Sequence, residues 1–227
     1  MGEEAIPATI IENTAYRGYR IIKLKPQRQF IFSPGQNAEF EISQSICREC
    51  GSKTFSIASS PTEGFIMFAT LVEGRESLYK RTLEKMRPGD EIIIWGPYGH
   101  FTLEKDAGEI VMIFHSIGVT PIRSMIVYSS ETGSDLRILA IHIDEKGDFL
   151  FREDLENATK RNKNIRVLWR REMLKASEIS ELVRDLEKPI FYISGPPQRV
   201  RDIISILRNA GVELSRERIK VESFTGY

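Results

Sequence analysis

The sequence lacks several features that would place it in a class at once. It has only two cysteines in 227 residues, and its 32 basic side chains are balanced by 32 acidic ones. Its longest apolar runs, at residues 92–95 and 110–114, are far shorter than the ~20 residues that cross a bilayer. The acidic N-terminus has neither the basic start nor the apolar block of a signal peptide.

These absences argue against several classes of protein. A net charge of zero disfavours a nucleic-acid-binding protein, because contacting many phosphates requires a basic surface. The short apolar runs exclude a membrane span, and the N-terminal composition argues against secretion. We therefore expect a cytoplasmic protein with no membrane span and no nucleic-acid partner.

The two cysteines, Cys47 and Cys50, form one Cys-x-x-Cys pair. No second pair or nearby histidine completes a zinc site, and two thiols are too few for an iron–sulfur cluster. No thioredoxin-like strand and helix surround them, so we interpret them as two loop thiols rather than as a redox pair. A disulfide is the alternative for a protein from a thermophile.

What the sequence does contain is an ordinary globular composition, 41% hydrophobic and 28% charged, over a length that suits two domains. The first hundred residues predict β structure, with turn signals between short segments rich in Ile, Phe and Thr. The expected strands lie at residues 6–14, 19–25, 37–42, 54–58, 64–72 and 91–95. One helix is expected at residues 75–86. This pattern indicates a small antiparallel barrel or sandwich.

After residues 96–99 the pattern changes to alternating strands and helices. Strands are expected at residues 109–114, 136–143, 165–169, 189–193 and 218–222, and helices at 120–130, 149–160, 176–186 and 197–209. Such alternation predicts an α/β doubly wound parallel sheet with helices on both faces. We place the boundary near residues 101–105.

Four segments carry residues suited to binding chemistry. They are Ser52–Pro61 at the end of a strand, Gly74–Ser77 at a helix start, and His115–Pro121 and Ser194–Pro197, each between a strand and a helix. Helix starts offer free N–H groups to phosphates, and doubly wound sheets bind ligands beyond the carboxyl ends of their strands. Thr120 suits the N-cap of the helix that follows it. Taken singly, each segment is also consistent with an ordinary turn or cap.

In this order and spacing, the segments resemble the ferredoxin–NADP reductase superfamily. The resemblance is carried by KTFSIASSP (53–61), GRESLYKRTLEKMRPGD (74–90), GPYGHF (96–101), IGVTP (117–121), SGPP (194–197) and ESFTGY (222–227). It implies an N-terminal antiparallel flavin-binding β-barrel over residues 1–103. It also implies a C-terminal pyridine-nucleotide-binding α/β domain over residues 104–227.

The resemblance assigns flavin contacts to the first segment. The family's Arg-x-Tyr-Ser/Thr motif lies over Lys53, Thr54, Phe55 and Ser56. In the family the basic residue meets the flavin phosphate, the aromatic ring packs on the flavin, and the final hydroxyl lies near flavin N5. Strand alternation sends Lys53 and Phe55 to one face and Thr54 and Ser56 to the other.

The second segment completes the implied flavin site. Leu71 and Val72 would lie along the isoalloxazine edge, and Gly74 and Ser77 match the part that holds the phosphate end. The family favours FAD over FMN as the bound flavin, although no decisive adenine contact is visible in the sequence.

The nucleotide contacts implied by the resemblance lie in the second half of the chain. Gly118, Thr120 and Pro121 would border the nicotinamide and diphosphate of NADH or NADPH, with Gly195 and Pro196 on the opposite wall. No metal-ligand cluster is visible.

The C-terminal sequence matches the family's Glu-x-aromatic ending near the flavin. Glu222 is the candidate for handling protons, and Ser56 for orienting and polarising the region near N5. Either Phe224 or the terminal Tyr227 would cover the flavin ring, and the sequence does not decide between them.

Several positions depart from the family pattern. Lys53 replaces an arginine, which exchanges a bidentate fork for a point charge. His115 and Ser116 stand where the family often has two glycines, which would crowd the diphosphate, and Ser194 stands where many members carry a cysteine. Asp144 follows the second parallel strand, where an acid accepts from a ribose 2′-OH and repels a 2′-phosphate, so it favours NADH over NADPH.

The expected function is that of a flavoprotein oxidoreductase that takes hydride from NAD(P)H onto bound FAD and passes electrons to a separate protein or small molecule. A non-catalytic flavin-binding regulatory subunit and an NAD(P)H:free-flavin reductase are the alternatives. A basic docking patch for an acidic partner is conceivable on the barrel side, but we interpret its cations as a solvated surface. These cations are Lys23, Lys25, Arg28, Lys80, Arg81 and Lys85.

Overall fold

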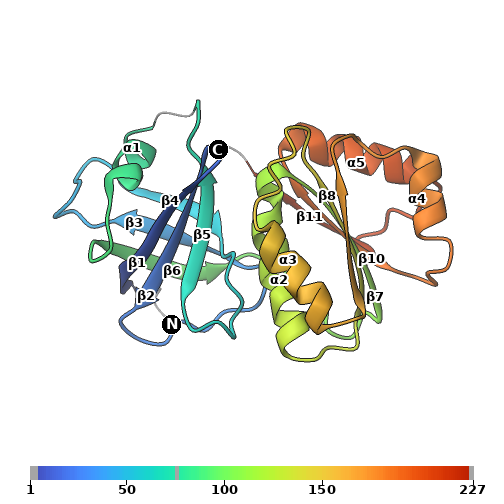
Figure 1. The fold of residues 1–227 in the computed structure, drawn as a ribbon, viewed down its shortest axis with the longest axis horizontal. Helices are drawn as coiled ribbons and strands as arrows, with labels where there is room; N and C mark the ends of the chain where they lie inside the picture. Colours follow the sequence, from blue (N-terminus) through green and yellow to red (C-terminus); the bar gives the residue numbers. More distant parts are fainter. Residues whose placement is uncertain (1–4, 75–76, 225–227) are drawn as a thin grey trace. The chain divides into compact units, whose positions relative to one another are not determined.

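The computed structural model describes residues 5–74 and 77–224. The chain divides into two compact units that join between Leu103 and Glu104 (Figure 1). The first unit is built on an antiparallel sheet and the second on a parallel sheet with helices, so the predicted fold class is confirmed.

The described part of the first unit holds a six-stranded sheet of order β4-β3-β6-β1-β2-β5. The strands are β1 (Ile6–Tyr16), β2 (Tyr19–Pro26), β3 (Asn37–Ile42), β4 (Ser52–Ser56), β5 (Ile66–Leu71) and β6 (Glu91–Tyr98). Just after β4, the Ala58 amide donates to the Met67 carbonyl of β5 at 2.7 Å. This bond joins the two edges of the sheet, which therefore curls into a barrel.

The barrel core follows from strict alternation along the strands. In β3 the residues Ala38, Phe40 and Ile42 are buried, while the residues between them are half-buried. The helix α1 (Leu78–Lys85) covers the core with Tyr79 and Leu83, both almost fully buried.

The helix α1 is shorter than the predicted helix 75–86. Ser77 is its N-cap, and the Ser77 hydroxyl accepts a hydrogen bond from the Lys80 amide at 3.2 Å. Residues 75 and 76 lie outside the described residues. The C-cap is Met86, shortly before the Pro88-Gly89 pair that was expected to end the helix.

The cysteine prediction was wrong. Cys47 and Cys50 form a disulfide in the loop between β3 and β4, so they are not two loop thiols. Cys50 belongs to the barrel core, and its Sγ lies 3.2 Å from Thr82 Oγ1 of α1. The sequence did not reveal that the turn brings the two side chains together over three residues.

The second unit has a five-stranded parallel sheet of order β11-β10-β7-β8-β9. Its strands are β7 (Glu109–His115), β8 (Arg137–Ile143), β9 (Ile165–Arg170), β10 (Ile190–Gly195) and β11 (Ile219–Ser223). The helices are α2 (Val119–Glu131), α3 (Arg152–Arg161), α4 (Ala176–Leu182) and α5 (Pro197–Asn209), with a short 3-10 turn at Ser116–Gly118. Helices α2 and α3 cover one face of the sheet and α4 and α5 the other (Figure 1).

The strand order positions the candidate ligand crevice. The chain runs from β7 through β8 to β9 on one side, then returns to place β10 and β11 on the other side of β7. The direction of winding therefore reverses between β7 and β10. In open α/β sheets, ligands bind at such a reversal, beyond the carboxyl ends of the two strands.

Three predicted helix boundaries in this unit were wrong. The helix α4 ends at Leu182 rather than at residue 186. The helix α3 begins at Arg152 rather than at residue 149, because Phe149 and Phe151 have positive φ values of 32° and 61° that a helix cannot contain. Helix α2 has Gly118 and not Thr120 as its N-cap. Among the described residues, no helix combines the length and apolar character needed to cross a membrane.

Candidate functional site

The end of β4 carries the first candidate site. Phe55 pairs with Ala38 and packs against the barrel core, and Lys53 pairs with Phe40. Lys53 and Thr54 are exposed. Ser56 is only 3% exposed, yet its Oγ has no hydrogen-bond partner. A buried hydroxyl without a partner is costly, so Ser56 fits a bound polar group.

Phe55 offers an aromatic surface beside Ser56. Its ring stacks on Phe68 with a centroid separation of 4.9 Å and an interplanar angle of 2°. Because Phe55 is only half-buried, part of its ring remains exposed. An aromatic ring supported from behind by the core is a suitable platform for a planar ligand such as a flavin.

The start of α1 lies beside the end of β5. The Lys80 ammonium donates to the Leu71 carbonyl at 2.7 Å, and Lys80 is 5% exposed. Our interpretation of Lys80 as a solvated surface cation was therefore wrong. Leu71 and Val72 are half-buried, and Gly74 is exposed.

A cavity of about 580 Å³ opens at this end of the barrel. Its lining includes two of the predicted flavin-binding residues, Val72 and Gly74, and two cations, Arg81 and Lys85. These cations were interpreted as a solvated surface. Both side chains are exposed, and the same lining carries two carboxylates, Glu73 and Glu84, so its formal charge is balanced.

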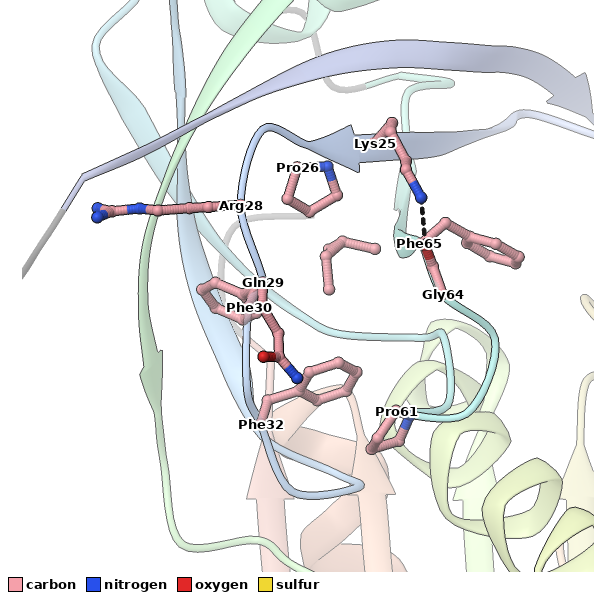
Figure 2. Close-up of a pocket in the computed structure, with 10 residues that line it drawn as sticks. Lys25, Pro26, Arg28, Gln29, Phe30, Phe32, Pro61, Gly64 and Phe65 are labelled. Carbon is pink, nitrogen blue, oxygen red and sulfur yellow. Dashed lines mark hydrogen bonds between the residues drawn. The ribbon is translucent and has the colours of Figure 1, made fainter.

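A second cavity of the barrel, of about 420 Å³, was not anticipated from the sequence (Figure 2). Phe30, Phe32 and Phe65 line it, and Lys25 at its rim donates to the Gly64 carbonyl at 3.3 Å. Its lining includes none of the predicted cofactor-binding residues that the structure describes. The apolar residues just before Pro34 were the only sequence signal for it.

In the second unit the two predicted nucleotide segments lie against each other. The Ser194 hydroxyl donates to the Gly118 carbonyl at 2.7 Å. A Cβ on Gly118 would collide with the Ser194 carbonyl and lie 2.9 Å from Gly195 Cα. A Cβ on Gly195 would lie 3.0 Å from the His115 carbonyl. Only glycine fits where these two turns meet, so their backbones lie in direct contact at the carboxyl ends of β7 and β10.

Of the two positions where the family often has glycine, Ser116 has a backbone conformation that favours it, whereas His115 is extended with a φ of −118°. Ser116 has a φ of 52°, a left-handed conformation that glycine adopts without strain. The Thr120 hydroxyl donates to the Ile117 carbonyl at 3.0 Å, and Thr120 and Pro121 are both buried. These two residues therefore shape the turn from within.

Asp144 does not lie where the nucleotide prediction needs it. It is 4% exposed, and its Oδ1 accepts from the amides of Gly147 and Asp148 at 3.0 and 3.4 Å. The Asp144 carboxylate therefore stabilises the turn that follows β8. The preference for NADH therefore stays a prediction, without an exposed Asp144 to support it.

Glu145, which the sequence did not single out, is the more accessible acid of this turn. One carboxylate oxygen lies 2.6 Å from His115 Nε2 and the other lies 2.6 Å from an Arg199 nitrogen. Partial burial tends to raise the pKa of the Glu145 carboxyl, but a backbone hydrogen bond and the charges of His115 and Arg199 outweigh it and lower that pKa.

A further cavity, of about 560 Å³, lies beyond β9. Arg170, Arg171 and Lys175 are among its lining residues, and Arg170 pairs with Glu178 at 2.7 Å. The adjacent arginines after a predicted strand were the signal that we overlooked. Two carboxylates, Glu172 and Glu178, line the same cavity, so basic and acidic side chains face each other there.

The C-terminal strand brings two predicted residues beside the crevice. Glu222 pairs with Ser194 in the parallel ladder, and the Phe224 amide donates to the Gly195 carbonyl at 3.0 Å. Glu222 and Phe224 are half-buried. Tyr227, the other candidate for covering a flavin, lies outside the described residues.

Comparisons with known proteins agree with the fold. No family model matches the chain. It is 26% identical to the glycine betaine monooxygenase reductase subunit of Chromohalobacter salexigens, over 82% of this chain and 55% of that protein. It is also 26% identical to the sulfhydrogenase 2 subunit gamma of Pyrococcus furiosus, over 86% of this chain and 74% of that protein. The chain thus spans about half the length of the first relative.

Solved structures give the same result. The cytochrome P450 reductase GcoB of Amycolatopsis superposes with a TM-score of 0.82 at 19% identity, over 98% of this chain and 70% of that one. The ferredoxin-NADP+ reductase of Plasmodium falciparum gives 0.76 at 16% identity, over 97% and 96%. The chain therefore shares the fold of these solved reductases, as the resemblance implied for its fold.

Proposed function

We propose that this protein is an NAD(P)H-dependent flavoprotein oxidoreductase that takes hydride onto bound FAD and passes the electrons to a separate acceptor. The observation that carries the proposal is the buried, unpartnered hydroxyl of Ser56 at the end of β4. Phe55, the preceding residue, is half-buried. FAD, when bound, supplies the redox chemistry that no protein side chain provides. The protein binds the flavin and the nucleotide, orients them for hydride transfer and protects the reaction from side reactions.

Each unit contributes one part of this work. In the first, Phe55 supports the flavin ring, the Ser56 hydroxyl orients it near N5, and the segment from Gly74 to Ser77 receives the phosphate end. In the second, the backbone around Gly118 and Gly195 receives the nicotinamide nucleotide, because a site without side chains allows close approach. Glu222 is the residue proposed to hold or release a proton.

The acceptor is proposed to be another protein. The names of the relatives describe subunits of a monooxygenase and of a hydrogenase, which supports a protein acceptor without identifying it. An NAD(P)H:free-flavin reductase and a regulatory subunit remain the alternatives to be tested. The regulatory alternative is favoured by one observation, the ion pairs of Glu145 that bridge the crevice.

The test is an anaerobic visible spectrum of the purified protein before and after addition of NADH and then of NADPH. A bound flavin that either nucleotide bleaches is the expected result. A bound flavin that neither nucleotide bleaches would favour the regulatory subunit, and a protein that binds neither FAD nor FMN would overturn the assignment of the flavin site.

The role of Ser56 has its own test. Ser56→Ala should keep the flavin and slow its reduction by roughly ten- to a hundredfold, because a hydrogen bond that orients the reacting atoms is lost. Ser129→Ala is the matched control, since Ser129 in α2 is also buried with an unpartnered Oγ. Stopped-flow absorbance measures the rate, and an unchanged rate in Ser56→Ala would contradict this role.

A further inference from the structure

The ion pairs of Glu145 cross the point where the winding of the parallel sheet reverses. Glu145 follows β8, His115 ends β7, and Arg199 lies in the first turn of α5 after β10. In the sheet, β7 stands between β8 and β10. The Glu145 carboxylate therefore spans the carboxyl end of β7 and joins groups from both sides of the ligand crevice.

The two partners of Glu145 form an arrangement suited to an anion. Arg199 is about a third exposed, and the His115 side chain is 9% exposed. Both donate to the same carboxylate, each at 2.6 Å. The other ring nitrogen of His115, Nδ1, is buried with no hydrogen-bond partner, so the ring has unused bonding capacity within the crevice. Arg199 also lies 3.7 Å from Asp202 in the same helix.

We propose that His115 and Arg199 bind the diphosphate of the pyridine nucleotide and that Glu145 is an internal carboxylate that occupies their donors until the nucleotide displaces it. The inference rests on the proposed function and specifies the residues that set nucleotide affinity in it. A carboxylate and a phosphate accept hydrogen bonds from the same donors, and a diphosphate brings more negative charge. It can therefore compete for Arg199 and His115.

Charge and solvation favour replacement of the Glu145 carboxylate by the diphosphate. Glu145 is partly exposed at its side chain, so it can turn into water when it is released, where its charge is solvated. Arg199 and His115 then gain the diphosphate as a partner. Holding Arg199 with an internal acid avoids leaving this partly buried cation unpaired between turnovers.

The experiment measures binding of ADP to the full-length, flavin-loaded protein by titration calorimetry. ADP carries a diphosphate and no nicotinamide, so its binding does not depend on hydride transfer. Glu145→Gln should bind ADP about three- to tenfold more tightly, and Arg199→Gln about tenfold more weakly. The double variant Glu145→Gln/Arg199→Gln should not bind ADP more tightly than Arg199→Gln alone, because the increase in affinity depends on Arg199.

The matched control is Glu109→Gln. Glu109 pairs with Arg137 at 2.6 Å, the same distance, but it stands at the opposite end of β7 and β8. It should leave ADP affinity unchanged. An affinity of Glu145→Gln within twofold of the unaltered protein, or the same gain in Glu109→Gln, would overturn the proposal.

Failure of this inference is distinguishable from failure of the proposed function. If NADH or NADPH bleaches the flavin but Glu145→Gln leaves ADP affinity unchanged, the inference alone is wrong. If Glu145→Gln tightens ADP binding but no nucleotide bleaches the flavin, the diphosphate site stands and the reductase proposal is wrong.

Discussion

The two candidate sites differ in how their polar groups are satisfied. At the end of the barrel, the Ser56 hydroxyl is buried without a partner. At the edge of the parallel sheet, the Ser194 hydroxyl is bonded to the Gly118 carbonyl and Glu145 is bonded to two side chains. A buried unsatisfied polar group costs about 1–3 kcal/mol, so a ligand that bonds to Ser56 would stabilise the barrel end. At the sheet edge His115 Nδ1 is also buried without a partner, but the Ser194 hydroxyl and the Glu145 carboxylate are satisfied within the protein.

This difference matches the two classes of ligand that we propose. A cofactor stays bound through many turnovers. A site whose buried polar groups are satisfied only by the cofactor is therefore not destabilised during the reaction. A nucleotide enters and leaves in each turnover, and internal partners keep its site intact while it is absent. Substitutions or solution conditions that affect one unit and leave the other unchanged test this difference between the barrel end and the sheet edge.

The largest effect is expected at the sheet edge, from Gly118→Ala. The new Cβ would collide with the backbone of Ser194 and Gly195, so the turn must move. We expect a loss of about 2–3 kcal/mol in the stability of the second unit and roughly tenfold weaker ADP binding. Thermal unfolding and calorimetry measure the two effects.

Ser194→Ala is a milder change at the same contact, because it removes only the hydroxyl that bonds to the Gly118 carbonyl. It should lower the stability of the second unit by about 1 kcal/mol. The flavin absorbance of both variants should be unchanged. Loss of the flavin in Gly118→Ala would show that the two sites are not independent in the way the comparison requires.

The next effect is expected in the barrel, from reduction of the Cys47–Cys50 disulfide. The disulfide joins cysteines that stand three positions apart, and closing this short loop should stabilise the barrel by about 2 kcal/mol. Dithiothreitol should therefore lower the unfolding midpoint of the unaltered protein. The double variant Cys47→Ser/Cys50→Ser should start at the lower midpoint and not respond. A midpoint of the unaltered protein that is insensitive to dithiothreitol would contradict the prediction.

The smallest effect is a pH dependence in the second unit, from His142. Burial among aromatic rings lowers the pKa of His142 to about 3, although the Ser116 backbone acts in the opposite direction. The unfolded chain then binds a proton that the folded chain excludes, so stability is lost as pH falls below the unfolded value near 6.5.

The expected loss is about 1 kcal/mol between pH 7 and pH 5.5. His142→Phe should remove this part of the pH dependence while keeping the aromatic packing. Chemical denaturation at the two pH values measures it. Equal pH dependence in the variant and the unaltered protein would show that His142 is not its source.

Much of the fold was predictable because its patterns are local. The predicted strands and helices correspond to the observed elements, since alternation and apolar runs are encoded in neighbouring residues. The start of α3 was not predictable, because the positive φ values of Phe149 and Phe151 depend on the packing of those rings. Lys80 was misjudged for a similar reason, since its partner, the Leu71 carbonyl, belongs to a different element.

The candidate site was predictable in its motifs but not in its polar contacts. The motif spacing indicated Ser56, Gly118 and Gly195, and their roles in binding stay predictions. The structure adds that Ser56 Oγ is buried without a partner and that the turns of the two glycines are in close contact. The sequence did not predict which of the two acids after β8, Asp144 or Glu145, contacts groups outside its own turn. Asp144 is used by its own turn, whereas Glu145 reaches side chains of other elements.

The sequence by itself determined the order of β and α segments and the motifs that carry the family resemblance, because both are properties of residues close together in the chain. Only the tertiary structure decided which polar groups are satisfied and which are left for a ligand. The physical reason is that a hydrogen bond needs two partners in register, and the partners here come from distant elements. His115 and Glu145 stand 30 residues apart, and Ser194 and Gly118 stand 76 apart.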